Sequence, residues 1–179
     1  RKQPLIARGA GRSYGDSANA ARVMQTKYLD GFIDFQPELG ILTVQAGVLL
    51  RDVLSFVLSR GWFLPVTPGS SFVSIGGAIA ADVHGKNHET AGTFGQHVLS
   101  VTLLLGSGEV VTVSPSQRSD LFHATCGGMG LTGIILQAEV QLIPVSSSYV
   151  HQHTLRLKCL EGLVEALESN SKSPYSVAW

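Results

Sequence analysis

Hydrophobic and polar positions along this chain follow two periods, and each predicts a different element. Alternating or continuous apolar runs of strand length predict strands over 4–8, 31–35, 41–46, 98–105, 109–113, 134–143 and 149–157. Apolar residues at helical spacing predict a helix over 49–60 that ends at Gly61, with shorter helices over 120–125 and 160–167. Turn residues at 37–40 and 106–108 predict two hairpins. Because hairpins and short helices are mixed without alternating βαβ units, the pattern indicates an α+β fold.

The stretch 68–87 interrupts this pattern with very small residues followed by polar ones. Gly76 and Gly77 are followed by alanines, and the run ends on His84, Gly85, Lys86, Asn87 and His88. Small residues let a backbone approach a large ligand closely and expose its N–H groups. This favours a large, flat, anionic cofactor against the small residues, with a substrate beside the polar cluster. The alternative is a tightly packed glycine-rich turn and short helix with no ligand.

Two further glycine clusters occupy loops. In the segment 9–16, Gly9, Gly11 and Gly15 permit positive φ and present N–H groups in a concavity suited to pyrophosphate, with Arg8 and Arg12 as added positive charge. The spacing is not that of a Rossmann fingerprint and no amphipathic helix follows, which disfavours a nicotinamide-binding Rossmann domain. The second cluster lies at 126–133, directly before a predicted strand.

Composition narrows the function classes further. Of the 179 residues, 44% are hydrophobic, and the 13 Lys and Arg balance the 13 Asp and Glu. That balance gives no general attraction to nucleic acid, and no run is long enough to span a membrane. Cys126 and Cys159 form no metal motif or disulfide framework, which favours a cytoplasmic protein and leaves membrane association open. Because the chain starts at Arg1 without Met, a removed leader also stays open.

Taken in order, four segments resemble the FAD-binding domain of the vanillyl-alcohol-oxidase/para-cresol-methylhydroxylase family. They are 7–16, 68–78, 84–87 and 127–134. The segments 84–88 and 92–95 carry a narrower likeness, to a member that oxidises a polyprenyl-phosphate-linked ribose as the flavin subunit of an epimerase. The resemblance covers about residues 4–145 and implies an α+β domain of two subdomains with FAD between them. The strand and helix that usually precede this region are expected to lie before Arg1.

The resemblance also implies where FAD is held. Its pyrophosphate would follow the 8–16 and 68–78 loops, its isoalloxazine ring would lie near 81–84, and its adenine side near Gly133 and Ile134. Many members attach FAD to a His of the first motif; here Arg12 takes that place, and His84 is a second possible attachment point, but the narrower likeness implies non-covalent FAD. The expected cofactor-binding residues are Ala7, Arg8, Gly9, Ala10, Gly11, Arg12, Ser13, Tyr14, Gly15, Asp16, Pro68, Gly69, Ser70, Ser74, Ile75, Gly76, Gly77, Ala78, Ala81, Asp82, His84, Gly133 and Ile134.

The implied activity is FAD-dependent oxidation of a secondary alcohol on a small or lipid-linked sugar. Sugar-lactone or alditol oxidation is one alternative, and a non-catalytic flavin- or nucleotide-binding module is another. The electron acceptor is not indicated, and a reductase partner would complete an epimerase. Residues 1–148 are expected to form the FAD-binding domain and 149–179 to begin a substrate domain, whose missing body would supply the catalytic base.

Several single residues have two interpretations. His84 and Lys86 are candidates to position substrate, although Lys86 could be a solvated loop lysine, and Arg12 a surface cation. His151 and His153 would share one face of a strand, but no third ligand accompanies them, so no metal site is expected. Cys126 is expected to be a small buried residue rather than a reactive thiol.

Overall fold

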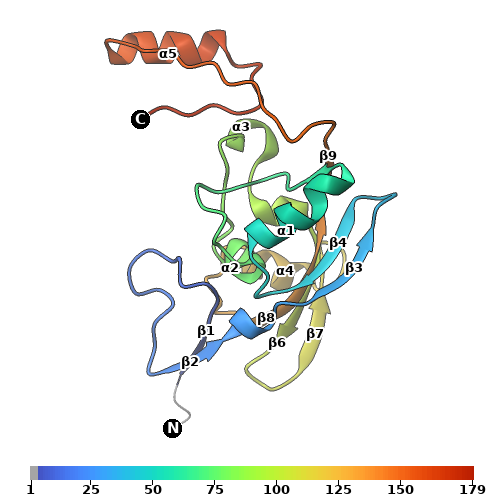
Figure 1. The fold of residues 1–179 in the computed structure, drawn as a ribbon. Helices are drawn as coiled ribbons and strands as arrows, with labels where there is room; N and C mark the ends of the chain where they lie inside the picture. The colour runs from blue at the N-terminus through green and yellow to red at the C-terminus, as the bar shows by residue number, and fades with distance from the viewer. Residues whose placement is uncertain (1–3) are drawn as a thin grey trace.

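A five-stranded antiparallel sheet forms the body of the molecule, in a computed structural model that describes residues 4–179. The strand order is β3-β4-β8-β6-β7 (Figure 1). Both predicted hairpins are confirmed, and β8 closes the sheet between them by pairing with β4 and β6. The bounds are β3 Phe32–Gln36, β4 Ile41–Gln45, β6 Val98–Leu104, β7 Val110–Val113 and β8 Ile134–Gln141.

One face of this sheet is buried and the other is polar, as alternation in an antiparallel sheet predicts. The buried side chains include Leu42, Val44, Val101, Ala138 and Val140. Helix α2 (Ile75–Ala80) packs on β4 and β8, and α4 (Ser119–Thr125) packs on β7. The expected α+β class is confirmed, whereas the division into two subdomains stays a prediction.

The predicted helix over 49–60 is confirmed with a tighter last turn. It consists of α1 (Leu50–Val57) followed by the 3₁₀ turn η2 (Leu58–Arg60), and Gly61 ends it in the left-handed conformation at φ 80°. Leu50, Val53 and Val57 are buried, so the helix is scaffold. The remaining short turns are η1 (Thr26–Tyr28), α3 (His88–Ala91) and η3 (Phe94–His97).

Two small sheets were only partly predicted. Strand β1 (Leu5–Arg8) was expected, but its parallel partner β2 (Arg22–Gln25) was not. The single strand expected over 134–143 is wrong at its end, because β8 stops at Gln141, where its neighbour strand β4 gives way to Gly40 in the left-handed conformation at φ 64°. The chain then forms β9 (Ile143–Pro144), which pairs with β5 (Trp62–Phe63) instead.

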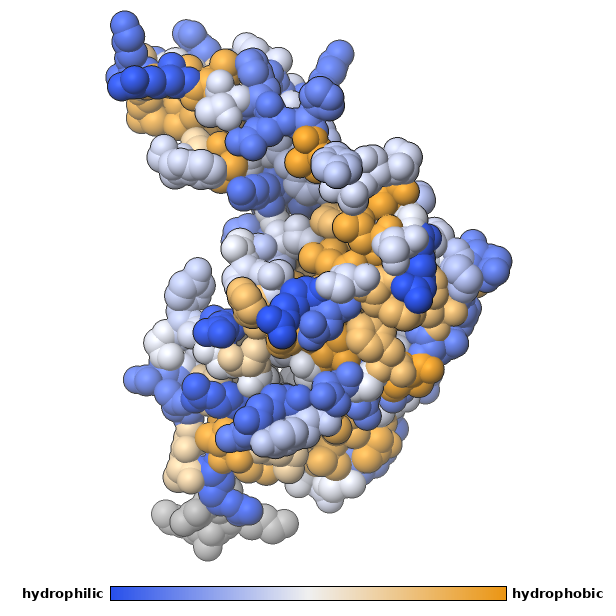
Figure 2. All heavy atoms as spheres, viewed as in Figure 1, coloured by the Kyte–Doolittle hydropathy of each residue, from blue (hydrophilic) through white to orange (hydrophobic). Residues whose placement is uncertain are grey.

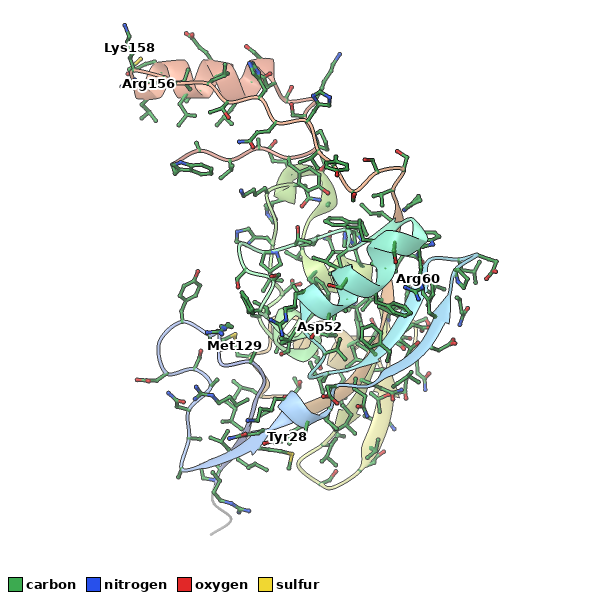
Figure 3. The ribbon with its side chains drawn as sticks, in the orientation of Figure 1. Tyr28, Asp52, Arg60, Met129, Arg156 and Lys158 are labelled. Carbon is green, nitrogen blue, oxygen red and sulfur yellow. The ribbon has the colours of Figure 1, made fainter. Side chains whose placement is uncertain are left out.

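Residues 149–179 form an arm that projects from the body (Figures 1 and 2). The predicted helix is confirmed as α5 (Leu160–Ser169), but the predicted strand over 149–157 is wrong, since that segment pairs with no other strand among the described residues. His151 and His153 therefore do not share a strand face, and Arg156 and Lys158 lie near the far end of the arm (Figure 3). No helix among residues 4–179 has the length and apolar character needed to cross a membrane. The boundary at 148/149 stays a prediction, and residues 1–3 of the first expected domain lie outside the described residues.

Candidate cofactor site

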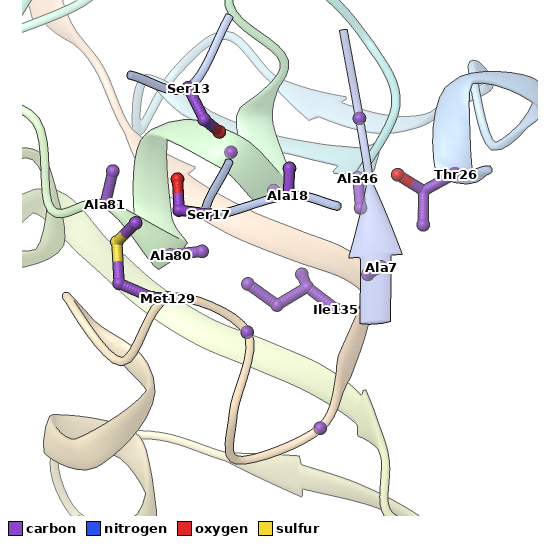
Figure 4. A pocket seen from close by; sticks show the side chains of 15 residues that line it. Ala7, Ser13, Ser17, Ala18, Thr26, Ala46, Ala80, Ala81, Met129 and Ile135 are labelled. Atoms are coloured by element: carbon purple, nitrogen blue, oxygen red, sulfur yellow. The ribbon is translucent and has the colours of Figure 1, made fainter. Parts of the chain in front are cut away.

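Three of the four motifs converge on one pocket lined mainly by glycine, alanine and serine (Figure 4). The pocket is open to solvent and has a cavity volume of about 80 Å³. From the expected residues it brings together Ala7, Gly9, Ser13, Gly76, Gly77, Ala81 and Gly133. The lining also includes residues that were not expected there: Ser17, Ala18, Thr26, Ala46, Ala80, Met129, Gly130 and Ile135.

The floor of the pocket depends on how closely β1 approaches α2. Ser74 caps α2, since its Oγ accepts the Gly77 N–H at 3.2 Å. Gly9 lies directly against that hydroxyl, and a Cβ at Gly9 would overlap the Ser74 Oγ. A Cβ at Gly76 would come within 2.9 Å of the Ala46 Cβ. Glycine is therefore needed at both positions for the packing of neighbouring segments.

The backbone N–H groups of the two expected phosphate loops differ in availability. At the start of α2, Ile75 donates to the Val48 carbonyl at 2.9 Å and Gly76 to the Ala46 carbonyl at 2.8 Å, so these groups are already bonded. By contrast, none of the N–H groups from Ala10 to Asp16, or from Gly69 to Ser71, donates to an acceptor within residues 4–179. The expectation that both loops offer donors thus holds for the first loop and for only the early part of the second.

Hydrogen bonds that start from the Arg8 side chain stabilise the first loop. Its guanidinium donates to the Asn19 Oδ1, and the Asn19 Nδ2 donates to the Asp16 Oδ1 at 3.0 Å. The Asn19 N–H also donates to the Asp16 carbonyl at 2.9 Å. Gly11 and Gly15 adopt positive φ as expected, but Gly9 does not. In this structure Arg8 and Asp16 shape the loop, and their side chains do not line the pocket.

The other expected site residues lie outside the pocket lining. Ile75 and Ala78 are fully buried in the core, and Ile134 is buried in β8, so their side chains cannot line the pocket. Tyr14 is 98% exposed, and the Arg12 guanidinium lies 5.7 Å from the centroid of the Phe72 ring. The rest sit on loops beside the pocket: Ala10, Gly11, Gly15, Pro68, Gly69, Ser70, Asp82 and His84.

Asp82 and Cys126 pack at the end of α2. Asp82 has φ 43°, and its Oδ1 accepts the Gly95 N–H at 2.8 Å. Burial, and secondarily the Asp82 carboxylate, raise the pKa of the Cys126 thiol to about 11. This agrees with the expected role of a small packed residue, because the reactive form of a thiol is the thiolate.

A thiol-labelling prediction follows for the two cysteines. At pH 8 Cys126 stays protonated while Cys159 is exposed, so iodoacetamide should modify Cys159 at least about tenfold faster than Cys126. The Cys126 rate should keep rising as the pH approaches its pKa. Peptide mass spectrometry of a labelling time course measures both sites. Equal rates at pH 8 would contradict the protected state of Cys126.

His84 and Lys86 lie on an exposed loop that is anchored by Asn87. Asn87 is buried and its Nδ2 donates to the Pro65 carbonyl at 2.8 Å. The His84 and His88 rings meet edge to face at 5.4 Å between centroids. The Lys86 Nζ lies 5.4 Å from the Trp179 ring centroid, and its carbonyl accepts the Ser176 N–H. Neither His84 nor Lys86 lines the pocket.

Comparison with known proteins adds the family context. Residues 1–114 match a family model described as FAD binding domain. The chain is 45% identical over 148 residues to decaprenylphosphoryl-beta-D-ribose oxidase of Mycolicibacterium smegmatis, which covers 81% of this chain and 32% of that protein. It is 33% identical over 124 residues to human Delta(24)-sterol reductase, covering 69% and 23% of the two chains.

A third relative is D-arabinono-1,4-lactone oxidase of Yarrowia lipolytica, 27% identical over 132 residues, with 72% of this chain and 25% of that protein covered. The chain therefore spans a third or less of the length of these curated relatives.

Proposed function

Because the chain belongs to the family of FAD binding domains, we propose that it holds FAD non-covalently as the cofactor domain of a sugar-oxidising flavin oxidoreductase. The family resemblance drawn from the four motifs is confirmed by the matching family model and by the relatives. The observation that carries the proposal is the glycine- and alanine-lined pocket at the meeting point of three motifs.

The residues of the pocket suit FAD in two respects. Its lining includes Gly9, Gly76, Gly77 and Gly130, which carry no side chain and so let a large planar ligand approach the backbone closely. The N–H groups from Ala10 to Asp16 make no bond within the described residues, and a pyrophosphate would supply their acceptors. FAD, when bound, supplies the hydride-accepting chemistry of such enzymes. The residues that would hold it are the pocket lining together with this loop.

Non-covalent binding is supported by the residues around the pocket. The first loop has Arg12 at the place where the family often carries a histidine. Among residues 4–179, the side chains that line the pocket include no histidine or cysteine. His84, the second possible attachment point, is exposed and lies outside the lining.

For the substrate, we favour a secondary alcohol of a polyprenyl-phosphate-linked ribose. The name of the Mycolicibacterium relative supports this, since the identity is 45% and its match extends over 81% of the chain. A sugar lactone or alditol is the alternative, supported by the Yarrowia relative. A non-catalytic flavin-binding module remains the alternative of another class. The catalytic base, the electron acceptor and any reductase partner that completes an epimerase would lie beyond the pocket.

Anaerobic mixing of the intact protein with candidate sugars tests the activity. We expect a polyprenylphosphoryl ribose to bleach the flavin absorbance, because reduction of the cofactor removes its visible bands. Bleaching by a free alditol or a sugar lactone, with the lipid-linked ribose inert, would favour the alternative substrate. Flavin that stays oxidised with every sugar would favour the non-catalytic module.

A prediction for Lys86 tests the substrate side of the proposal. An ammonium on the anchored loop suits a phosphate or a ring hydroxyl. Lys86→Met should lower kcat/KM by about ten- to a hundredfold, the loss of one charge-assisted hydrogen bond, while the FAD content stays unchanged. The matched control is Lys27→Met, since Lys27 is also exposed and its Nζ also lies over an aromatic ring, at 4.8 Å from the Tyr28 centroid. Near-normal kinetics in the Lys86 variant would remove this residue from the substrate site.

A further inference from the structure

Met129 has a backbone conformation that its residue type rarely adopts. Its φ is +53°, in the left-handed region that costs energy for a residue with a Cβ. It lies in the loop between α4 and β8, and its neighbours Gly127 and Gly130 also have positive φ. Such strain persists only where the surrounding structure imposes it, and it often marks a functional site.

The loop around Met129 is held at several points. The Met129 N–H donates to the Ala80 carbonyl at 2.8 Å, and the Gly127 N–H donates to the Ile79 carbonyl at 3.0 Å. Both carbonyls belong to the last turn of α2, so these bonds tie the loop to the end of that helix. The hydroxyls of Thr125 and Thr132 meet at 3.0 Å and close the base of the loop. These contacts fix the direction in which the Met129 side chain leaves the backbone.

That direction is into the pocket. Figure 4 shows the Met129 side chain rising from its loop toward Ala81, and Figure 3 shows it between the first loop and α2. Met129 is 42% exposed, so it gains little packing energy from the described residues that would offset the strained backbone. It is also a long, flexible, polarizable side chain in a lining that consists mostly of glycine, alanine and serine.

We propose that Met129 is a cofactor-binding residue, whose side chain covers FAD in the pocket through its apolar volume and determines how tightly it is held. This inference rests on the proposed binding of FAD. The contact with FAD would offset the energetic cost of the left-handed backbone. The loop between α4 and β8 would then form a fixed wall of the cofactor pocket.

The test uses the intact protein, stripped of FAD, with two variants that separate strain from contact. Met129→Gly relieves the positive φ and removes the side chain, so the melting temperature without FAD should stay equal or rise, while the Kd for FAD rises about tenfold. Met129→Leu keeps the volume and the strain, and its Kd should remain within about threefold of the wild type. Flavin fluorescence titration gives the Kd, and circular dichroism gives the melting temperature.

Three results would overturn the inference. Met129→Gly could bind FAD as tightly as the wild type, which would show that the side chain makes no useful contact. It could instead lower the melting temperature of the FAD-free protein, which would make Met129 a support of the fold. Met129→Leu could weaken FAD binding as much as Met129→Gly, which would exclude side-chain volume as the cause. A failure of the proposed function is distinguishable, because the wild-type protein itself would then take up no FAD.

Discussion

Replacing Gly9 with alanine is expected to weaken FAD binding and to destabilise the fold at the same time. The added Cβ would overlap the Ser74 Oγ, and Ser74 cannot move away without breaking its cap on α2. Either β1 shifts away from α2 or the cap opens, and both deform the pocket floor. We expect the free energy of unfolding to fall by about 1–3 kcal/mol, as in overpacked sites. The Kd for FAD should rise at least about tenfold.

Urea unfolding and FAD titration of the same protein measure both effects. The matched control is Gly106→Ala, in the β6–β7 hairpin, because a Cβ there meets nothing within 4 Å. It should change stability by no more than about 0.5 kcal/mol and leave FAD binding intact. If Gly9→Ala behaves like this control, then the close approach of β1 to α2 does not shape the site.

Phe94→Ala is expected to cause the largest loss of stability. Phe94 has no exposed surface, and its N–H donates to the Val83 carbonyl at 2.8 Å, which ties the loop carrying His84 and Lys86 to the core. Truncating a buried phenylalanine costs about 3–5 kcal/mol. Phe72→Ala is the matched control, since Phe72 is 45% exposed and should cost far less. Urea unfolding of both variants measures these losses of unfolding free energy. A loss below about 1 kcal/mol for Phe94→Ala would contradict the packing described.

The period of the apolar residues was enough to predict both hairpins, α1, α4 and α5. The same pattern gave wrong or missing predictions where the formation of a strand depends on pairing with a segment distant in sequence. β2 exists because it lies beside β1, and 149–157 stays irregular because no strand pairs with it. The end of β8 shows the same limit, because its partner strand β4 begins only after the turn at Gly40, and sequence alone extends β8 through its apolar run.

The sequence predicted the loops that form the candidate site better than it predicted the other residues that line the pocket. Glycine clusters identified the segments that converge, but Thr26 and Ala46 could not have been found, since only the fold brings them to the pocket. Met129 had a signal in the sequence, because it lies inside the glycine cluster at 126–133. The 92–95 segment contributed to the narrower family likeness, and its Phe94 belongs to the core.

The most direct test of the central claim, that the glycine- and alanine-lined pocket holds FAD without a covalent bond, is acid precipitation of the purified intact protein after its visible spectrum is recorded. We predict a flavin spectrum before precipitation, a colourless pellet, and FAD in the supernatant in an amount close to one per chain. A protein without any flavin spectrum, even after incubation with FAD, would contradict the cofactor assignment. A yellow pellet would contradict non-covalent binding and would direct attention back to His84 as an attachment point.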